Sequence, residues 1–192
     1  MAELINIASG GVVEFLFHDL MPELTPQQIV AHNLQSDQGY YTYKNAIVAE
    51  TEDRAVGVAL SFPALFHEIT AEMRQYFPKD RLDHLAKFYA ARVDDSLLLN
   101  ALCVDQKLRR NGIGSELISL TKKKAKQAGF KVLSLMVFAD NAEALSVYHR
   151  NGFEVFAPVE LNSHEQIPHE GGCLLMKSNI DDQIKSNRGV IE

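Results

Sequence analysis

Residues 97–153 constrain the fold of this chain most, because a strand, a glycine loop and a helix start follow one another there. Residues 97–104 are a nearly unbroken apolar run, and after a short polar turn residues 109–115 read Arg-Arg-Asn-Gly-Ile-Gly-Ser. Free N–H groups at a helix start, with the positive end of the helix dipole, bind anions such as phosphate. A side chain at Gly112 or Gly114 would hold a phosphate away from the backbone. The pattern therefore predicts a phosphate-binding loop.

The spacing of this loop excludes two common kinds of phosphate site. A dinucleotide fingerprint requires a third glycine three residues after the second, and a P-loop requires Gly-Lys-Ser/Thr starting five residues after its first glycine. Counted from Gly112, both requirements fall on Leu117. The loop therefore belongs to neither kind.

Two motifs together point to a family. Residues 109–114 have the pattern Arg-x-x-Gly-x-Gly, which resembles the pyrophosphate loop of the GCN5-related N-acetyltransferases (GNAT), enzymes that bind acetyl-coenzyme A. A second segment resembles the other signature of that family, with Asn141, Ala144, Tyr148 and a final Gly152-Phe153 at matching intervals. The two motifs cover about a third of the chain.

The resemblance implies an α/β (α+β) GNAT fold, with a central mixed twisted sheet, helices on both faces, and a cofactor strand that splays from the next strand. We expect one domain over residues 1–178, a helical insertion at about 64–95 and a mobile tail at 179–192. The family begins with a short strand, whereas residues 3–20 read as a helix interrupted at a Gly-Gly pair. The first strand is therefore expected to be absent, or the start of the chain truncated.

Two helix starts carry capping signals. Thr25 is followed by Pro26 at the first helical position and by Gln28, which completes a capping box. Asp140 with Glu143 resembles a second capping box, and Asn141 is the alternative helix cap.

Apolar runs separated by turn residues predict strands, and the order strand, helix, strand around the glycine loop predicts a right-handed βαβ unit. The other expected strands form a hairpin in the first half of the chain, a buried strand after the loop helix and a final hairpin. These strands are 46–50, 55–62, 132–138, 153–158 and 172–177.

Composition limits the class of protein. The chain has 192 residues, 46% hydrophobic and 23% charged, with a net charge of −6, which argues against a general nucleic-acid binder. No apolar run approaches the ~20 residues of a membrane span, and no basic segment precedes an apolar run as in a signal peptide. We therefore expect a cytoplasmic protein without nucleic-acid or membrane partners.

The cysteines and histidines give no sign of a metal site. Cys103 and Cys173 lie in apolar, strand-like runs and are expected to be buried free thiols, with a disulfide or a nucleophile as alternatives. His164 and His169 fall in a polar loop and are expected to be solvated.

The resemblance assigns the cofactor site. The main chain of the cofactor strand would pair with pantetheine, and the Leu102 N–H would donate to the thioester carbonyl. The amides of the glycine loop would hold the pyrophosphate, with Arg109 and Asn141 as further contacts. The implied cofactor residues are Leu102, Cys103, Val104, Arg109, Arg110, Asn111, Gly112, Ile113, Gly114, Ser115, Asn141 and Tyr148.

Tyr148 is the expected general acid. The thiolate leaving group needs a proton, and a phenol with a pKa of about 10 is protonated at pH 7 and can supply it. The alternative is a core tyrosine that shares a helix stripe with Ala144.

The general base is not evident. Many family members carry a carboxylate on the cofactor strand, but the inward positions here are Leu98 and Asn100, which cannot accept a proton. The proton of the acceptor would then pass through water to Glu50, Glu68 or His67.

Three functions remain open. The first is transfer of an acetyl group from acetyl-coenzyme A to a primary amine, on a small molecule or a peptide, by direct attack in a ternary complex. The second is a non-catalytic acyl-coenzyme A binding or sensing module, and the third is a generic nucleotide-binding protein. Carboxylates of the 64–95 insertion would attract a cationic acceptor or simply face solvent. Dimerisation is common in the fold, so a homodimer is one expected state.

Overall fold

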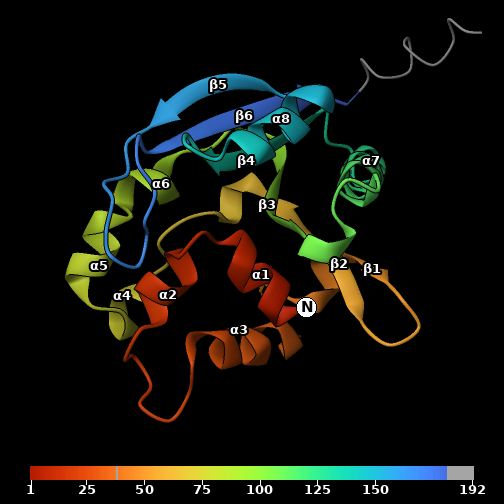
Figure 1. Cartoon of the computed structure of the whole chain (residues 1–192). Helices are drawn as coiled ribbons and strands as arrows, with labels where there is room; N and C mark the ends of the chain where they lie inside the picture. The colour runs from red at the N-terminus through yellow and green to blue at the C-terminus, as the bar shows by residue number, and fades with distance from the viewer. Residues whose placement is uncertain (38, 181–192) are drawn as a thin grey trace, which may run out of the picture.

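The computed structural model describes residues 1–37 and 39–180 and has one mixed sheet of six strands at its centre (Figure 1). The strand order is β1-β2-β3-β4-β6-β5. Only the β3–β4 pair is parallel; the other pairs are antiparallel. The strands are β1 (Ala46–Glu50), β2 (Ala55–Pro63), β3 (Ser96–Val104), β4 (Val132–Phe138), β5 (Glu154–Val159) and β6 (Cys173–Asn179).

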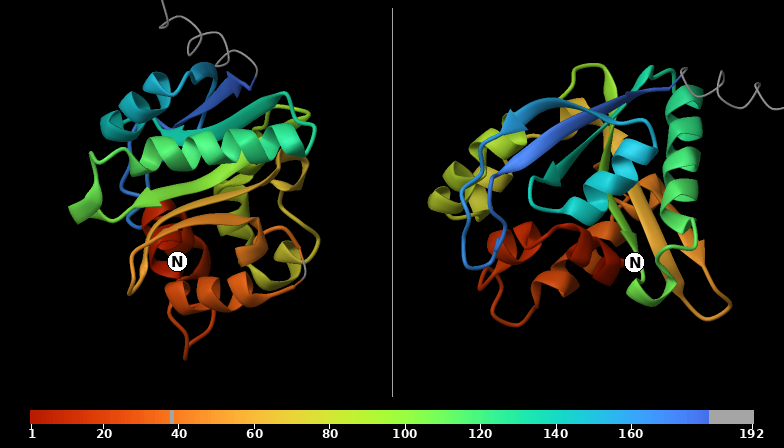
Figure 2. Two further views of the ribbon diagram at one scale, coloured as in Figure 1. Left: turned by 90° about the vertical axis from the view of Figure 1, so that its right-hand side faces the viewer. Right: turned by 45° about the horizontal axis from the view of Figure 1, so that its top comes forward.

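Helices cover both faces of the sheet, as expected for the GNAT fold (Figure 2). One face packs against α7 and α8, whereas the other packs against the N-terminal helices and the helices between β2 and β3. None of the described helices is both long and apolar enough to cross a bilayer. The helices are α1 (Ala2–Ala8), α2 (Val12–Phe17), α3 (Pro26–Gln35), α4 (Met73–Tyr76), α5 (Lys79–His84), α6 (Ala86–Ala90), α7 (Ile113–Gln127) and α8 (Ala142–Arg150).

The predicted splay of the cofactor strand is confirmed by the register of β3 and β4. Their pairing begins at Ser96↔Val132 and ends at Leu99↔Leu135. β3 then continues to Val104 without this partner. One side of the second half of β3 is thus left without a neighbouring strand.

A β-bulge at Asn100 accompanies the separation. β2 pairs Leu60 with Ala101 and Ser61 with Leu99, so that Asn100 is the extra residue on β3. A bulge changes which face the following side chains point to. Accordingly Leu99 packs in the cluster under α7, whereas Ala101 packs in the cluster under α1 and α3.

The expected break after the first helix is confirmed and has a steric cause. Gly10 and Gly11 have φ values of +56° and +97°. A Cβ on Gly10 would lie 2.3 Å from the Phe138 ring, and one on Gly11 would lie 1.8 Å from the carbonyl oxygen of Gln166. The chain therefore turns where it meets the end of β4 and the β5–β6 loop. The first strand along the chain is β1, at the sheet edge.

The 64–95 insertion is helical, as expected, but it consists of short pieces. A 3-10 turn at Ala64–Phe66 precedes α4, α5 and α6, and the longest of the four has six residues. These pieces bury apolar side chains against α2, the end of β4 and the start of β6. The insertion thus closes one end of the sheet.

One capping prediction is confirmed and one is wrong. Thr25 Oγ1 accepts from the Gln28 N–H at 3.3 Å, and the Thr25 N–H donates to Gln28 Oε1 at 2.8 Å. At α8, however, Asn141 is the cap, and its Oδ1 accepts from the Ala144 N–H at 3.1 Å.

Asp140 anchors the β5–β6 loop instead of capping α8. Its carboxylate lies 2.8 Å from His169 Nδ1 and accepts from the Glu170 N–H at 2.9 Å. The His169 ring also stacks on Phe138, with centroids 3.9 Å apart. The expectation that His169 is solvated is therefore wrong.

The folded domain reaches past the expected start of the tail. β6 includes Asn179, and Ile180 is buried while its N–H donates to the Lys131 carbonyl at 2.9 Å. Residues 181–192 of the predicted mobile tail lie outside the described residues.

We expect Gly11→Ala to lower the free energy of unfolding by about 3 kcal/mol or more, because the new Cβ meets a backbone carbonyl that cannot move aside. Gly129→Ala is the matched control: Gly129 has a φ of +85° but open space around its Cβ. It should cost only about 1 kcal/mol, the strain of a left-handed alanine. Urea unfolding of both variants measures the difference, and equal losses would contradict the steric account.

Candidate functional site

The separation of β3 and β4 is part of a large cavity of ≈ 2510 Å³. Its walls include the second half of β3, the end of β4, the glycine loop, the start of α8 and the segment around His67. Most of the cofactor residues expected from sequence therefore share one cavity. Asn111 is the exception; its side chain instead donates from Nδ2 to the Leu108 carbonyl at 3.2 Å.

The glycine loop forms an open cradle at the N-terminus of α7. Gly112 is the N-cap, with a φ of +81°, and no side chain caps the helix. Glu116 is the first residue whose N–H joins the helical ladder, 3.0 Å from the Gly112 carbonyl. Within the described part of the chain, the N–H groups of residues 111–115 have no protein acceptor. A Cβ at Gly112 would meet nothing within 4 Å, so the cradle has room for an anion.

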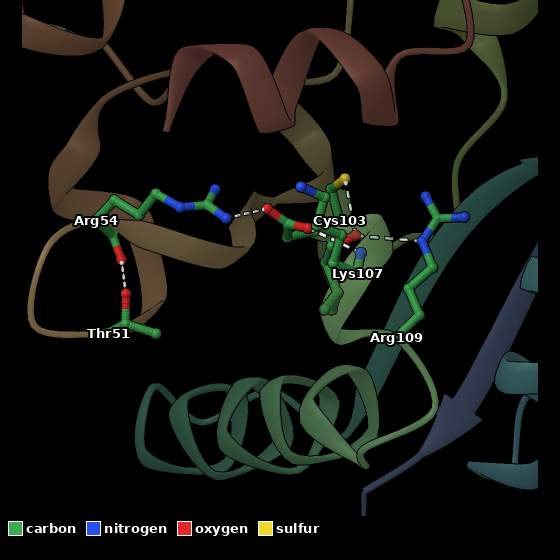
Figure 3. Close-up of polar contacts among 7 residues, drawn as sticks. Thr51, Arg54, Cys103, Lys107 and Arg109 are labelled. Carbon is green, nitrogen blue, oxygen red and sulfur yellow. Dashed lines mark hydrogen bonds and ion pairs between the residues drawn. The ribbon is translucent and has the colours of Figure 1, made fainter.

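Arg109 fastens the start of the loop to the end of β3 (Figure 3). Its Nε donates to the Val104 carbonyl at 3.2 Å, and its Nη1 lies 3.5 Å from the Glu143 carboxylate on α8. These contacts reach across from the loop after β3 to the helix after β4. Arg109 thus shapes the cradle mouth even without an anion.

Asp105 stabilises the turn that leads into the loop. Its Oδ1 accepts from the Lys107 N–H at 2.9 Å, and its Oδ2 lies 2.6 Å from Arg54 Nη2 on the β1–β2 hairpin (Figure 3). The Lys107 N–H and then the Arg54 guanidinium hold the pKa of Asp105 below its usual value. Both contacts favour the ionised carboxylate.

Tyr148 projects from α8 into the same cavity and is buried. Its ring packs edge-on against Phe153, with centroids 5.7 Å apart. Burial, and next the nearby Cys103 sulfur, raise the pKa of the Tyr148 phenol well above its usual value. The phenol is therefore protonated throughout the neutral range, the state that a proton donor needs.

Both cysteines are free and buried, in agreement with the sequence. Burial raises the pKa of Cys103, an effect that Arg109 partly opposes, and burial raises the pKa of Cys173 to about 12. A thiol with a raised pKa is a poor nucleophile at pH 7. The nucleophile alternative is therefore not supported for either residue.

The three candidate proton acceptors, Glu50, Glu68 and His67, lie in different surroundings. Glu50 is exposed at the end of β1 and is not part of the cavity wall. Glu68 lines the cavity but is exposed, whereas His67 lines it and is 3% exposed. Of these three residues, only His67 is a buried ionisable group on the cavity wall.

The surroundings of His67 are aromatic. Its ring stacks on Tyr89, with centroids 5.0 Å apart, and meets Phe88 edge-on at 5.3 Å. Burial lowers the pKa of His67 to about 4 and raises the pKa of Tyr89 to about 12. The pKa of Tyr41 is also raised, by burial first and by Tyr89 second. All three groups are therefore neutral at pH 7.

Sequence reasoning missed Tyr41, Phe88 and Tyr89 as cavity residues. Tyr41 lies far along the chain from the adjacent Phe88 and Tyr89, so no local pattern joins the three. It also missed the bulge at Asn100, for which a polar residue inside an apolar strand was the only signal. Among the described residues, no group of three or more His, Cys, Asp or Glu side chains is placed to hold a metal ion.

Acid should destabilise the fold through His67. Because its pKa falls from 6.5 to about 4 on folding, the unfolded chain takes up the proton first as the pH drops. Stability is thus lost between about pH 6.5 and pH 4, by about 2 kcal/mol between pH 7 and pH 5. We expect this part of the loss to disappear in His67→Asn, measured by urea unfolding at both pH values. His32→Asn, which removes an exposed histidine of α3, controls for the type of change; equal acid sensitivity in the two variants would contradict the assignment.

Comparison with known proteins agrees with this geometry. A curated relative, "GCN5-related N-acetyltransferase 7, chloroplastic" of Arabidopsis thaliana, is 39% identical over 56 residues, 29% of this chain. The matched region spans only 20% of that relative. Among solved structures, one described as an acetyltransferase has a TM-score of 0.59 at 20% identity and covers 94% of this chain and 97% of its own.

A GNAT family acetyltransferase of Elizabethkingia anophelis, solved with acetyl-CoA bound, has a TM-score of 0.51 at 14% identity, covering 92% of this chain and 88% of its own. Likenesses at such low identity show the fold alone. The model of the "Acetyltransferase (GNAT) family" matches residues 13–153, which is most of the chain. The chain therefore belongs to the GNAT acetyltransferase family.

Proposed function

We propose that this protein is an N-acetyltransferase that moves the acetyl group of acetyl-coenzyme A to a primary amine, on a small molecule or a peptide. The observation that carries the proposal is the second half of β3, which has no β4 partner. This stretch lines one cavity together with the buried Tyr148 and the N-terminus of α7, which no side chain caps. An extended chain with amides at one end and phosphates at the other fits this arrangement. Pantetheine pyrophosphate has that form.

The cofactor would be held mainly by backbone groups. The main chain of Leu102, Cys103 and Val104 would pair with the pantetheine amides, and the N–H groups of residues 110–115 would bind the pyrophosphate. Arg109 would remain at the cradle mouth. Asn141 would contact the cofactor from its position as the cap of α8.

The reaction would proceed by direct attack in a ternary complex. The amine nitrogen attacks the thioester carbonyl carbon, and the Leu102 N–H stabilises the oxyanion, an effect worth roughly 3 kcal/mol in other acyl-transfer sites. The C–S bond then breaks, the sulfur takes the Tyr148 proton, and the proton lost by the amine returns through water to the phenolate. The products are an amide and free coenzyme A.

The alternative of a non-catalytic acyl-coenzyme A module rests only on the missing strand carboxylate. It gives no role to the protonated Tyr148 or to the part of the cavity around His67.

The two buried free thiols are consistent with a reducing compartment such as the cytoplasm. A homodimer remains part of the proposal and is measurable by light scattering.

Ser115→Asp should separate cofactor binding from stability. An acidic residue in the first turn of α7 favours the helix. In the structure, Asn151 Nδ2 donates to Ser115 Oγ at 3.1 Å, and the aspartate carboxylate can accept the same hydrogen bond. The same charge repels a bound pyrophosphate. We expect unchanged or slightly higher stability and about 10-fold weaker coenzyme A binding by calorimetry, equivalent to about 1.4 kcal/mol. Ser115→Asn is the neutral control, and equal affinity of the two variants would contradict the cradle.

Tyr148→Phe should lower kcat by about 100-fold, the usual share of a general acid. Coenzyme A affinity should stay within about 3-fold of the parent, because the phenol acts on the leaving sulfur. Thiol release measures the rate and calorimetry the binding. Full activity of this variant on an amine that the parent acetylates would remove Tyr148 from the mechanism.

A further inference from the structure

The acceptor end of the cavity has a single buried polar atom without a partner. His67 Nδ1 has almost no accessible surface and no hydrogen bond reaches it within the described structure, so a ligand in the cavity pairs with it only when the His67 ring turns toward the cavity. The His67 side chain lines the cavity between Phe88 and Tyr89. Leaving a buried polar atom unpaired is unfavourable, and a ligand that supplies the missing hydrogen bond would recover that loss. A neutral imidazole protonated at Nε2 presents an acceptor at Nδ1, which suits the N–H of an amine.

The walls around His67 are flat and apolar. Phe62 packs with Leu98 and Tyr41 in one cluster, at the start of β3. Tyr40 and Phe66 stack at the rim, with centroids 3.5 Å apart, and are 40% and 38% exposed. We call the six side chains Tyr41, Phe62, His67, Phe88, Tyr89 and Leu98 the aromatic pocket; all six line the cavity.

The aromatic pocket adjoins the point where β3 and β4 separate. Leu98 pairs with Phe62 across β2 and β3 and stands two residues before the bulge at Asn100. Asn100 also lines the cavity. An acceptor seated in the pocket would thus place its amine next to the separating strands.

Charges are divided along the cavity. Its arginines, Arg109, Arg110 and Arg150, all come from the cradle and α8, where the Glu143 carboxylate is paired with Arg109. The exposed carboxylates Glu68 and Glu72 line it just after His67. An amine would therefore be attracted to the mouth of the aromatic pocket, and a carboxylic acid would be repelled.

We propose that the acceptor is a monoamine carrying an aromatic ring or a similar flat apolar group, with the ring in the aromatic pocket and the amine N–H on His67 Nδ1. The inference rests on the proposed acetyl transfer and names its acceptor class. A polyamine would have to bury a second ammonium among neutral groups, which costs far more than apolar burial returns. A peptide would bring backbone polar groups that the aromatic side chains cannot satisfy.

The test compares three probes with acetyl-coenzyme A in a thiol-release assay: 2-phenylethylamine, spermidine and a peptide with a free N-terminal alanine. We expect kcat/KM for 2-phenylethylamine to exceed the values for the other two probes by at least about 10-fold, because its ring would be buried and it carries no second ammonium to desolvate. A higher value for spermidine or the peptide overturns the acceptor class while leaving acetyl transfer intact.

Two substitutions of His67 distinguish a binding role from a structural one. His67→Leu removes the unpaired nitrogen, so we expect higher stability at pH 7 together with a KM for 2-phenylethylamine raised by about 10-fold. His67→Asn keeps a polar atom near the Nδ1 position and should restore most of the affinity. His32→Leu, on exposed α3, is the control for the assay. A His67→Leu variant with unchanged KM would overturn the proposed contact.

Calorimetry keeps the two proposals apart. Coenzyme A is titrated first, and 2-phenylethylamine is then titrated into the complex with coenzyme A, so that binding is measured without turnover. Absence of coenzyme A binding would refute the proposed function. Coenzyme A binding without 2-phenylethylamine binding would refute the acceptor class alone, and binding of both with a loss in His67→Leu is the expected result.

Discussion

The separation of β3 from β4 after Leu99 is the constraint on which the rest of the structure depends. Beyond that residue, the β4-facing backbone groups of β3 have no neighbouring strand. Unpaired buried backbone groups are costly, so a fold keeps them only where a ligand or water completes them. An extended ligand that lies between the strands can take the place of the missing strand. The backbone N–H and C=O groups of β3 that would pair with a neighbouring strand thereby form a binding surface.

Helix packing on both faces of the sheet stabilises this separation. α7 and α8 pack on one face of both strands, and Leu97, Leu117 and Phe153 share a buried cluster there. On the other face, the Gly-Gly turn brings α2 against the end of β4 and the β5–β6 loop. Packing on both faces holds β3 and β4 in place without hydrogen bonds between their second halves. The cavity is therefore a consequence of the core.

Local signals in the sequence predicted most of the fold and brought out the residues that we propose to hold the cofactor. The Thr25 capping box, the Gly-Gly break and the glycine loop all depend on interactions within a few residues, so spacing alone reveals them. The proposed acceptor half depends on His67, Tyr41 and Tyr89, whose proximity is set by tertiary packing. The cap of α8 shows the same limit: Asp140 and Asn141 are both good caps, and the distant His169 decides between them.

The neutrality of the aromatic pocket bears on the missing general base. Burial holds His67 deprotonated and Tyr89 protonated, with pKa values of about 4 and about 12. Apolar surroundings also disfavour an ammonium, so an amine entering from the carboxylates at the mouth would lose its proton more easily as it moves inward. The neutral amine is the form that attacks a thioester. On the proposed mechanism, a pocket that desolvates its acceptor would need no carboxylate on β3, where Asn100 stands at the bulge.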